Sequence, residues 1–397
     1  MNQYSAIIDI GSSKILCLIC SDNQGENMLV HGAGIREYSG YKNAQFESAQ
    51  ALGDAIVDAL EMAEKEAKHR VREISVGVPT PFLCVLLQDA SIELQGKRVD
   101  YEDIEALLNA SMPAEKPEGY TLMHSTPTGF MVDGAFRHDM PIGLPVQNVS
   151  ARVSHVYVET RFQTLVTESL KRIGLDADMY IGVPLSEALF VIPAEERING
   201  AVLIDVGATH TDVSYVQGNA LLACKCINVG GIHFTNDLAY GLRMQSSIAE
   251  GIKRRYVYAL DYQDNVDIVR IPGGGTLKVE HAAIQYIIEA RTKELAELII
   301  HAMFDMGLQI TTDMPVYLTG GGISLMRGSC EYLEGIMGVP IRVRMPWMPR
   351  LSSPNYASGF SVMDFVIHAG ENQDVGLLQG LTAKNKWLRK IRDFFIK

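Results

Sequence analysis

The chain has 397 residues, of which 47% are hydrophobic and 21% are charged, and its net charge is −12 at pH 7. This length exceeds what one hydrophobic core usually serves, so two or more domains are expected. The acidic balance argues against general nucleic-acid binding, and no segment reaches the ~20 consecutive apolar residues of a membrane-spanning helix.

The first predicted elements are two apolar strands joined by a turn of small residues, Asp9-Ile-Gly-Ser-Ser-Lys14, with a third strand over 28–35. A glycine such as Gly11 lets the backbone approach a bulky anion. Successive N–H groups in such a turn form an anion-binding nest, and the hydroxyls of Ser12 and Ser13 could donate further hydrogen bonds. The turn is therefore a candidate phosphate-binding site.

The next part of the chain alternates between helical and strand patterns. Helices are predicted over 48–68, 101–108 and 164–173, and strands over 74–78 and 149–158. The segment 81–160 has a middle part rich in proline and glycine.

The strand–turn–strand plan recurs 196 residues after its first occurrence, with Asp205-Val-Gly207-Ala208-Thr209 in the turn and a third strand over 220–229. A single Asp-x-Gly turn is common in ordinary loops, but two copies in matching contexts predict two similar domains. Asp9 and Asp205 would then face each other across a cleft. Two carboxylates there suit Mg²⁺ held mainly through water, and they could orient an attacking water.

A third glycine signature, Gly320-Gly-Gly-Ile323, follows a predicted strand over 316–318. A helix is predicted from Ser324 through Gly335, ending near Gly338. Backbone without side chains could lie against a purine and a ribose. A strand–helix turn that needs glycine only for its geometry explains the pattern equally well.

The chain has six cysteines, and two of them form a lone Cys-x-x-Cys inside a predicted strand. Strand residues three apart point to opposite faces, which disfavours a shared zinc or redox site. We therefore interpret all six as reduced core thiols: Cys17, Cys20, Cys84, Cys224, Cys226 and Cys330.

The three glycine turns together resemble the two phosphate motifs and the adenosine motif of the superfamily of actin, the 70-kDa heat-shock chaperones and the sugar kinases. The whole chain resembles the FtsA family of cell-division proteins, most closely in V-G-G-I-H-F-T-N-D-L-A-Y-G-L-R over 229–243 and A-E-G-I-K over 249–253. Shorter resemblances lie at 132–134, 141–143, 182–189 and 353–357.

The resemblance implies an α/β fold of the actin-like, ribonuclease-H-like type, with two domains and a family-specific insert subdomain in domain I. The implied domain I core comprises 1–80 and 161–190, with the insert over 81–160 between them. The implied domain II core comprises 191–245 and 311–370, and its outer subdomain over 246–310 contains a long helix near 282–307. A linker over 371–383 and an amphipathic helix over 384–397 follow.

The resemblance also implies that ATP and Mg²⁺ bind between the two halves. Asp205 and Asp9 would be the catalytic residues and would hold Mg²⁺ through water. The residues implied to contact the nucleotide are Gly11, Ser12, Ser13, Lys14, Gly207, Ala208, Thr209, Gly230, Gly231, Asn236, Glu250, Lys253, Gly320, Gly321, Gly322 and Ile323.

The second phosphate turn departs from the family pattern, because Ala208, Thr209 and His210 stand where the family has Gly, Gly and Thr. Side chains there crowd the phosphates, so we expect at most a slow ATPase. His210 either contacts a phosphate or has a structural role.

The C-terminal segment 384–397 has six basic residues and one acidic residue, whereas the other 383 residues have 29 basic and 46 acidic residues, a net −17. Its apolar residues recur at helical spacing, with Arg389 and Lys390 on the other side. The apolar face consists of Trp387, Leu388, Ile391, Phe394 and Phe395. Such a helix is typical of a membrane interface, and a terminal helix docked on the protein itself is the alternative.

These features predict a peripheral protein at the cytoplasmic face of the cell membrane, since no secretory signal pattern precedes the first strand. The FtsA resemblance implies that it polymerises and binds the C-terminal peptide of FtsZ and other division proteins, whereas the acidic charge predicts that it does not bind nucleic acid. A PilM-type pilus-assembly adaptor and a small-molecule kinase of the same superfamily are the alternatives.

Overall fold

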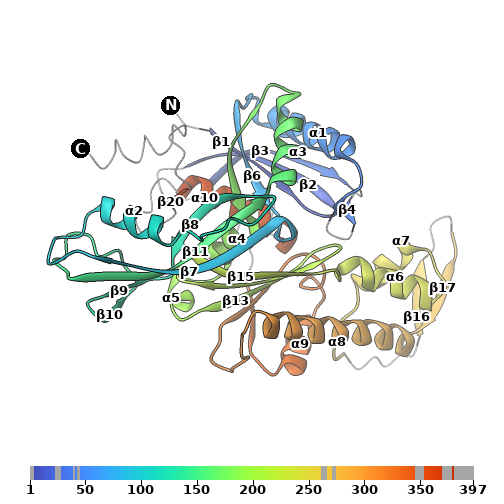
Figure 1. Ribbon diagram of the computed structural model, residues 1–397. Helices are drawn as coiled ribbons and strands as arrows, with labels where there is room; N and C mark the ends of the chain where they lie inside the picture. Colours follow the sequence, from blue (N-terminus) through green and yellow to red (C-terminus); the bar gives the residue numbers. More distant parts are fainter. Residues whose placement is uncertain are drawn as a thin grey trace.

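The computed structural model describes residues 4–22, 28–38, 41–42, 45–260, 266–270, 274–344, 353–368 and 378–379. Within these residues, three larger β-sheets and their helices make up an α/β fold (Figure 1).

The first sheet has five described strands in the order β12-β6-β1-β2-β3. Its antiparallel part is the predicted strand–turn–strand plan, and β6 and β12 then run parallel to β1. The strands are β1 (Tyr4–Ile10), β2 (Lys14–Asp22), β3 (Met28–Glu37), β6 (Glu73–Val78) and β12 (Asp176–Gly182). Helices α1 (Ala49–Ala67) and α3 (Thr160–Lys171) pack together and against this sheet.

The second sheet repeats this arrangement in the order β15-β14-β13-β18-β19. Three antiparallel strands are again followed by two parallel ones, so the predicted duplication is confirmed at the level of sheet topology. The strands are β13 (Ala201–Val206), β14 (Thr211–Gln217), β15 (Ala220–Ile227), β18 (Val316–Thr319) and β19 (Ile341–Val343).

Two helices lie between these sheets (Figure 1). α10 (Ala357–His368) packs against β1 and β2, and α4 (Val183–Val191) packs against β13 and β14. The helices also pack against each other, and the hydroxyls of Ser186 and Ser361 lie 3.1 Å apart between them. α4 covers most of the family-like stretch 182–189, and α10 begins at the end of the stretch 353–357. The two helices bring the ends of β1 and β13 to a common region.

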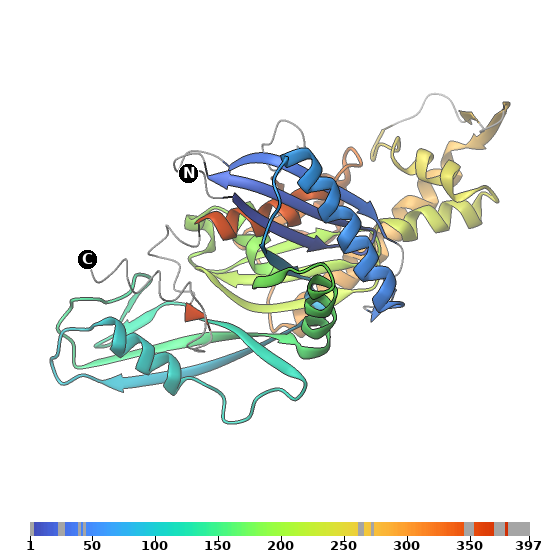
Figure 2. The ribbon, with the colours of Figure 1, turned by 90° about the horizontal axis from the view of Figure 1, so that it is seen from above.

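The third sheet belongs to the segment predicted as an insert. Its long central strand β11 pairs with β7 on one side and with β8 and β9 on the other. Its elements are β7 (Leu83–Glu93), α2 (Tyr101–Ala110), β8 (Tyr120–Pro127), β9 (Phe130–Val132), β10 (Ala135–Arg137) and β11 (Asn148–Glu159). This sheet and the outer elements of the second half lie at opposite ends of the molecule (Figure 2).

The outer elements of the second half follow β15 in the chain. They are α6 (Gly231–Gly241), α7 (Ser246–Lys253), β16 (Val266–Arg270), β17 (Thr276–Glu280) and α8 (His281–Asp305), with α9 (Ser329–Met337) packed against α8. The remaining described elements are short: β4 (Tyr41–Lys42), β5 (Gln45–Phe46), α5 (Ala194–Arg197), and 3₁₀ turns at Thr80–Phe82 and Pro354–Tyr356.

Two helix starts differ from the sequence prediction. α3 begins at Thr160, directly after β11, rather than at 164. α9 begins at Ser329 rather than at Ser324, because the chain continues in a turn up to Gly328, whose φ of +78° is left-handed and favours glycine. A glycine-rich turn thus extends further than the helical pattern suggested.

The predicted linker also makes a contact with the body of the protein. Its residues Leu378–Gln379 form β20, which pairs antiparallel with Ser125 and His124 of β8. The predicted amphipathic helix 384–397 lies outside the described residues. Among the helices that the structure describes, none has the length and apolar character needed to cross a bilayer.

Candidate functional site

The two predicted phosphate turns, which recur at a spacing of 196 residues, meet in the structure. The backbone N–H of Thr209 donates to Ser12 Oγ over 3.3 Å. Each turn is closed in the same way, by Gly11 N donating to Lys14 O and by Gly207 N donating to His210 O. The duplicated sequence plan therefore brings two backbone turns of like geometry against each other.

Two further glycine segments, the third signature and the start of α6, join the second turn through backbone hydrogen bonds. Gly322 N donates to Val206 O over 2.7 Å, and Gly231 N donates to Gly207 O over 2.9 Å. A Cβ on Gly322 would lie 2.4 Å from Gly207 O, closer than real Cβ contacts. Gly320 adopts a φ of +87°, and a Cβ there would meet Asp205. These three segments pack so closely that only glycine fits at their junction.

Glu250 and Lys253 lie beside this junction and form an ion pair with each other. Lys253 is buried, and its ammonium donates to Gly231 O, to Thr235 Oγ1 and to the Glu250 carboxylate at 2.7–3.1 Å. Burial would raise the pKa of Glu250, but the hydrogen bonds from Lys253, Thr235 and Arg254 outweigh it and lower that pKa to about 2. The pair thereby ties α7 to the start of α6.

Lys14 contacts the segment before α10, which the sequence had not linked to it. Its ammonium donates to Asn355 O and lies 4.0 Å from the centre of the Tyr356 ring. Burial lowers the pKa of Lys14 to about 8, although Asp9 and Asp205 act in the opposite direction. Ser358 donates to Asp9 Oδ2 over 2.7 Å, so one short segment holds both ends of the first turn.

A group of carboxyls lies around the two turns. Burial raises the pKa of Asp9, and burial followed by the charge of Asp212 raises the pKa of Asp205 to about 7. Glu187 on α4 is 2% exposed, and its pKa is raised well above the usual value by burial and by Asp205, Asp9 and Asp212. A divalent cation would relieve this crowding of negative charge, which is the chemistry that a Mg²⁺–phosphate site requires.

The sequence prediction missed Glu187. One signal was available, because Glu187 is the only charged residue in the apolar stretch Gly182-Val-Pro-Leu-Ser-Glu-Ala-Leu189. A charged residue inside a buried helix is rarely without a partner or a function.

The other predicted nucleotide contacts lie on the same segments with varied exposure. Gly207, Ala208 and Thr209 are partly exposed, Ile323 is buried, and Ser13 and Asn236 are exposed. Asn236 lies on α6, and its predicted nucleotide contact stays a prediction. The predicted membrane residues Trp387, Leu388, Arg389, Lys390, Ile391, Phe394 and Phe395 lie outside the described residues.

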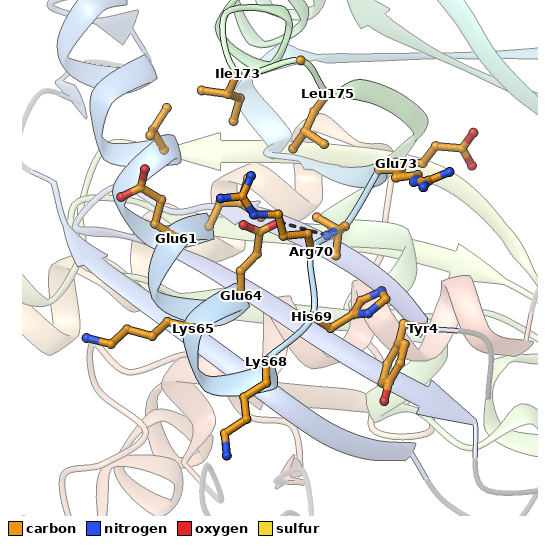
Figure 3. A pocket seen from close by; sticks show the side chains of 15 residues that line it. Tyr4, Glu61, Glu64, Lys65, Lys68, His69, Arg70, Glu73, Ile173 and Leu175 are labelled. Carbon is orange, nitrogen blue, oxygen red and sulfur yellow. Dashed lines mark hydrogen bonds between the residues drawn. The ribbon is translucent and has the colours of Figure 1, made fainter. Parts of the chain in front are cut away.

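A separate hollow of about 1440 Å³ lies at the C-terminal end of α1 (Figure 3). The rings of Tyr4 and His69 lie there with centres 4.4 Å apart and planes tilted by 32°, and Glu64, Lys65 and Lys68 also line the hollow (Figure 3). Its lining includes none of the predicted nucleotide contacts, and its mixed charges do not select one kind of ligand.

Comparison with known families gives two matches. The family model described as "Cell division protein FtsA" matches residues 202–361, and the one described as "SHS2 domain inserted in FTSA" matches residues 85–157. Together they span more than half of the chain, and the second coincides with the sheet of β7–β11.

Curated relatives match over most of their length. The cell division protein FtsA of Pseudomonas aeruginosa is 25% identical over 365 residues, which are 90% of this chain and 87% of that protein. FtsA of Agrobacterium fabrum is 27% identical over 358 residues, 86% of this chain and 81% of that protein.

Solved structures share the fold at low sequence identity. The PilM–PilN type IV pilus biogenesis complex contains a chain with a TM-score of 0.60 and 18% identity, covering 92% of this chain and 99% of that one. MreB 5 of Spiroplasma citri, solved bound to AMPPNP, has a TM-score of 0.54 and 13% identity, and the match covers 98% of this chain and 99% of that one. At these identities the likeness shows the actin-like fold alone.

Proposed function

Because this chain belongs to the FtsA family of actin-like cell-division proteins, we propose that it binds ATP·Mg²⁺ between its two similar sheets. The observation that carries the proposal is the meeting of three segments. The backbone N–H of Thr209 in the second turn donates to the Ser12 hydroxyl of the first, and the third glycine signature joins the second turn through the backbone bond from Gly322 N to Val206 O. Turns of this kind direct N–H groups at anions, and the neighbouring Glu250–Lys253 pair supplies polar groups for the ribose and base.

The carboxyls around the turns would hold the metal and position water. Asp205 and Asp9 would hold Mg²⁺ through water molecules, and bound Mg²⁺ would neutralise phosphate charge. Glu187 would accept a proton from, or orient, a water near the phosphates, because it is buried beside both aspartates. Ala208 and Thr209 in the second turn would keep hydrolysis slow.

The cellular role follows from the family and from the sequence of the C-terminal segment. The protein would polymerise at the cytoplasmic face of the membrane and tether the FtsZ ring through the FtsZ C-terminal peptide. The segment 384–397 would be the anchor, since its basic and apolar residues suit an anionic lipid surface. The domain boundaries proposed above would apply, with 81–160 as the insert and 246–310 as the outer subdomain.

Calorimetric titration with ATP·Mg²⁺ tests the nucleotide site. A Cβ on Gly321 would lie 2.6 Å from the Cβ of Asn355, so Gly321→Val should disturb the third glycine signature. We expect at least about tenfold weaker binding, a loss of ~1.4 kcal/mol. Gly335→Ala on α9, where a Cβ meets nothing within 4 Å, is the matched control and should bind normally. Unchanged binding by a folded Gly321→Val protein would place the nucleotide elsewhere.

A kinase of the same superfamily is the second candidate, and Glu187 is the observation that favours it. A buried carboxyl beside the phosphate turns could serve as the base for an acceptor hydroxyl. ATP consumption that rises on addition of a small-molecule acceptor would support this candidate, and consumption independent of any acceptor would support the division protein.

A further inference from the structure

Strand pairing in the second sheet places three chemically distinct side chains in one row. Asp205 of β13 lies opposite Asp212 of β14, and Asp212 lies opposite Cys226 of β15. Directly opposed residues on neighbouring strands point to the same face of a sheet. Cys226 therefore shares a face with the carboxyls of the candidate nucleotide site, although the sequence predicted only a core thiol.

His210 completes a compact group of possible metal ligands. One ligand atom from each of His210, Asp212 and Cys226 lies within 4.8 Å of the others. His210 Nε2 and Asp212 Oδ2 are 3.3 Å apart, and both residues are at least nine-tenths buried. The second carboxylate oxygen, Asp212 Oδ1, is buried and has no hydrogen-bond partner in the described part of the chain. A buried acceptor without a donor is costly, and a cation would satisfy it.

We propose that His210, Asp212 and Cys226 bind a zinc-class transition-metal ion, with water as the fourth ligand. One nitrogen, one sulfur and one oxygen donor suit Zn²⁺, whereas Mg²⁺ prefers oxygen ligands in an octahedron. At ordinary zinc–ligand distances, a tetrahedral site places nitrogen and oxygen donors about 3.3 Å apart. His210 Nε2 and Asp212 Oδ2 lie at this separation, and the unpaired Oδ1 belongs to the same carboxylate.

Metal binding at this cluster has a defined proton balance. The thiol of Cys226 loses its proton to solvent when sulfur binds the metal, and His210 binds as neutral imidazole after releasing any second proton. Without the metal, the same residues form a hydrogen-bonded histidine–aspartate pair beside a neutral thiol. The two states differ in charge and in thiol ionisation, so they can be distinguished spectroscopically.

The site would act on the second phosphate turn. The carbonyl of His210 accepts the hydrogen bond from Gly207 N that closes this turn. His210 also stands where the family motif has threonine, so the histidine ligand is a departure of this chain from that motif. A metal held by His210 would fix the shape of the turn whether or not nucleotide is bound.

Titration of the full-length, metal-free chain with Co²⁺ alone, followed by absorption, tests the proposal. Cobalt in a tetrahedral site with a thiolate ligand gives visible ligand-field bands and a near-ultraviolet sulfur-to-cobalt band. We expect both bands to saturate at one ion per chain and to disappear when Zn²⁺, but not Mg²⁺, is added. Affinity should increase with pH, because binding releases protons.

Variants separate this site from the other thiols. Cys226→Ser should abolish the near-ultraviolet band, and His210→Thr should weaken binding at least about tenfold, since even residues behind metal ligands contribute that much. Cys224→Ser, two residues away on β15, is the matched control and should keep the full spectrum. Two results would contradict the proposal: a wild-type chain without a sulfur-to-cobalt band, or a folded Cys226→Ser variant that keeps the band. In either case the cluster is only a metal-free histidine–aspartate pair.

Discussion

Glu187 shows how one side chain can define the chemistry of a site. It is 2% exposed, and Asp9, Asp205 and Asp212 all act on it electrostatically. A carboxyl with a raised pKa is suited to accept or hold a proton near neutral pH. Its place on α4, between the two sheets, puts it beside both phosphate turns.

Glu187→Gln should slow ATP hydrolysis by about 10²-fold while nucleotide affinity changes little. The amide keeps the shape of the side chain but cannot take up a proton, and proton transfer typically contributes 10²–10⁴-fold. Single-turnover hydrolysis and calorimetric binding, measured on the same preparation, separate the two effects. Unchanged turnover would assign the proton-handling role to Asp205 alone.

Glu250 should make stability depend on pH in the acid range. Its folded-state pKa, about 2, lies below the ordinary 4.5. Its ionised form therefore stabilises the fold above pH ~4.5, and this contribution is lost as pH falls toward 2. For this partly exposed group we expect about 1–2 kcal/mol.

Urea unfolding of the nucleotide-free protein at about pH 7 and about pH 4 measures the contribution of Glu250 to stability. The free energy of unfolding of wild type should exceed that of Glu250→Gln at the higher pH, and the difference should narrow at the lower pH. A difference that grows as pH falls would have the wrong sign for a depressed pKa.

At the scale of elements, the contact between α1 and β3 is among the tightest in the first half. A Cβ on Gly34 would lie 1.8 Å from the carbonyl oxygen of Ala59, so the helix backbone lies directly on the strand. Gly34→Ala should push α1 away from the sheet and destabilise the protein by about 3 kcal/mol. Gly251→Ala on α7, where a Cβ meets nothing within 4 Å, should not destabilise it.

Thermal unfolding of the two alanine variants measures this difference. Equal melting temperatures would mean that α1 can move away from β3 without loss of packing.

The repeated strand plan was predictable because its signals are local. In each half, two apolar runs and the Asp-x-Gly turn between them occur within about fifteen residues, and they appear as β1–β2 and β13–β14. The prediction started α9 at Ser324, five residues before its true start at Ser329. The helical pattern begins at Ser324, but the chain stays in a turn as far as Gly328. The pairing of β20 with β8 could not be predicted, because two residues carry no pattern and their partners lie far away in the chain.

The site combines continuous motifs with contacts between distant parts of the chain. The glycine turns could be recognised as candidate phosphate sites because each is a continuous motif. Their contact with each other, the contact of Lys14 with Asn355, and the row that ends at Cys226 depend on strand register and helix packing. Only the folded chain brings those residues together.

On the scale of the whole molecule, charge separates the body from the C-terminal segment. Residues 384–397 carry a net +5, and the other residues carry −17. An anionic membrane should therefore repel the body and attract this segment, with an electrostatic part that salt screens. Trp387→Glu should release the protein from anionic liposomes without changing ATP binding.

Sedimentation with liposomes of anionic and of neutral lipid at two salt concentrations measures the membrane binding of each variant. A chain that ends at Gln379 keeps β20 and serves as the deletion control. If it sediments as well as the full chain, the anchor lies in the body.

The central claim is that one ATP contacts both halves at once, and hydrogen–deuterium exchange with and without ATP·Mg²⁺ tests it most directly. The account predicts that nucleotide slows exchange together in peptides that contain 11–14, 207–209 and 320–323. Slowing confined to one of these segments, or to the hollow around 65–72, would contradict it.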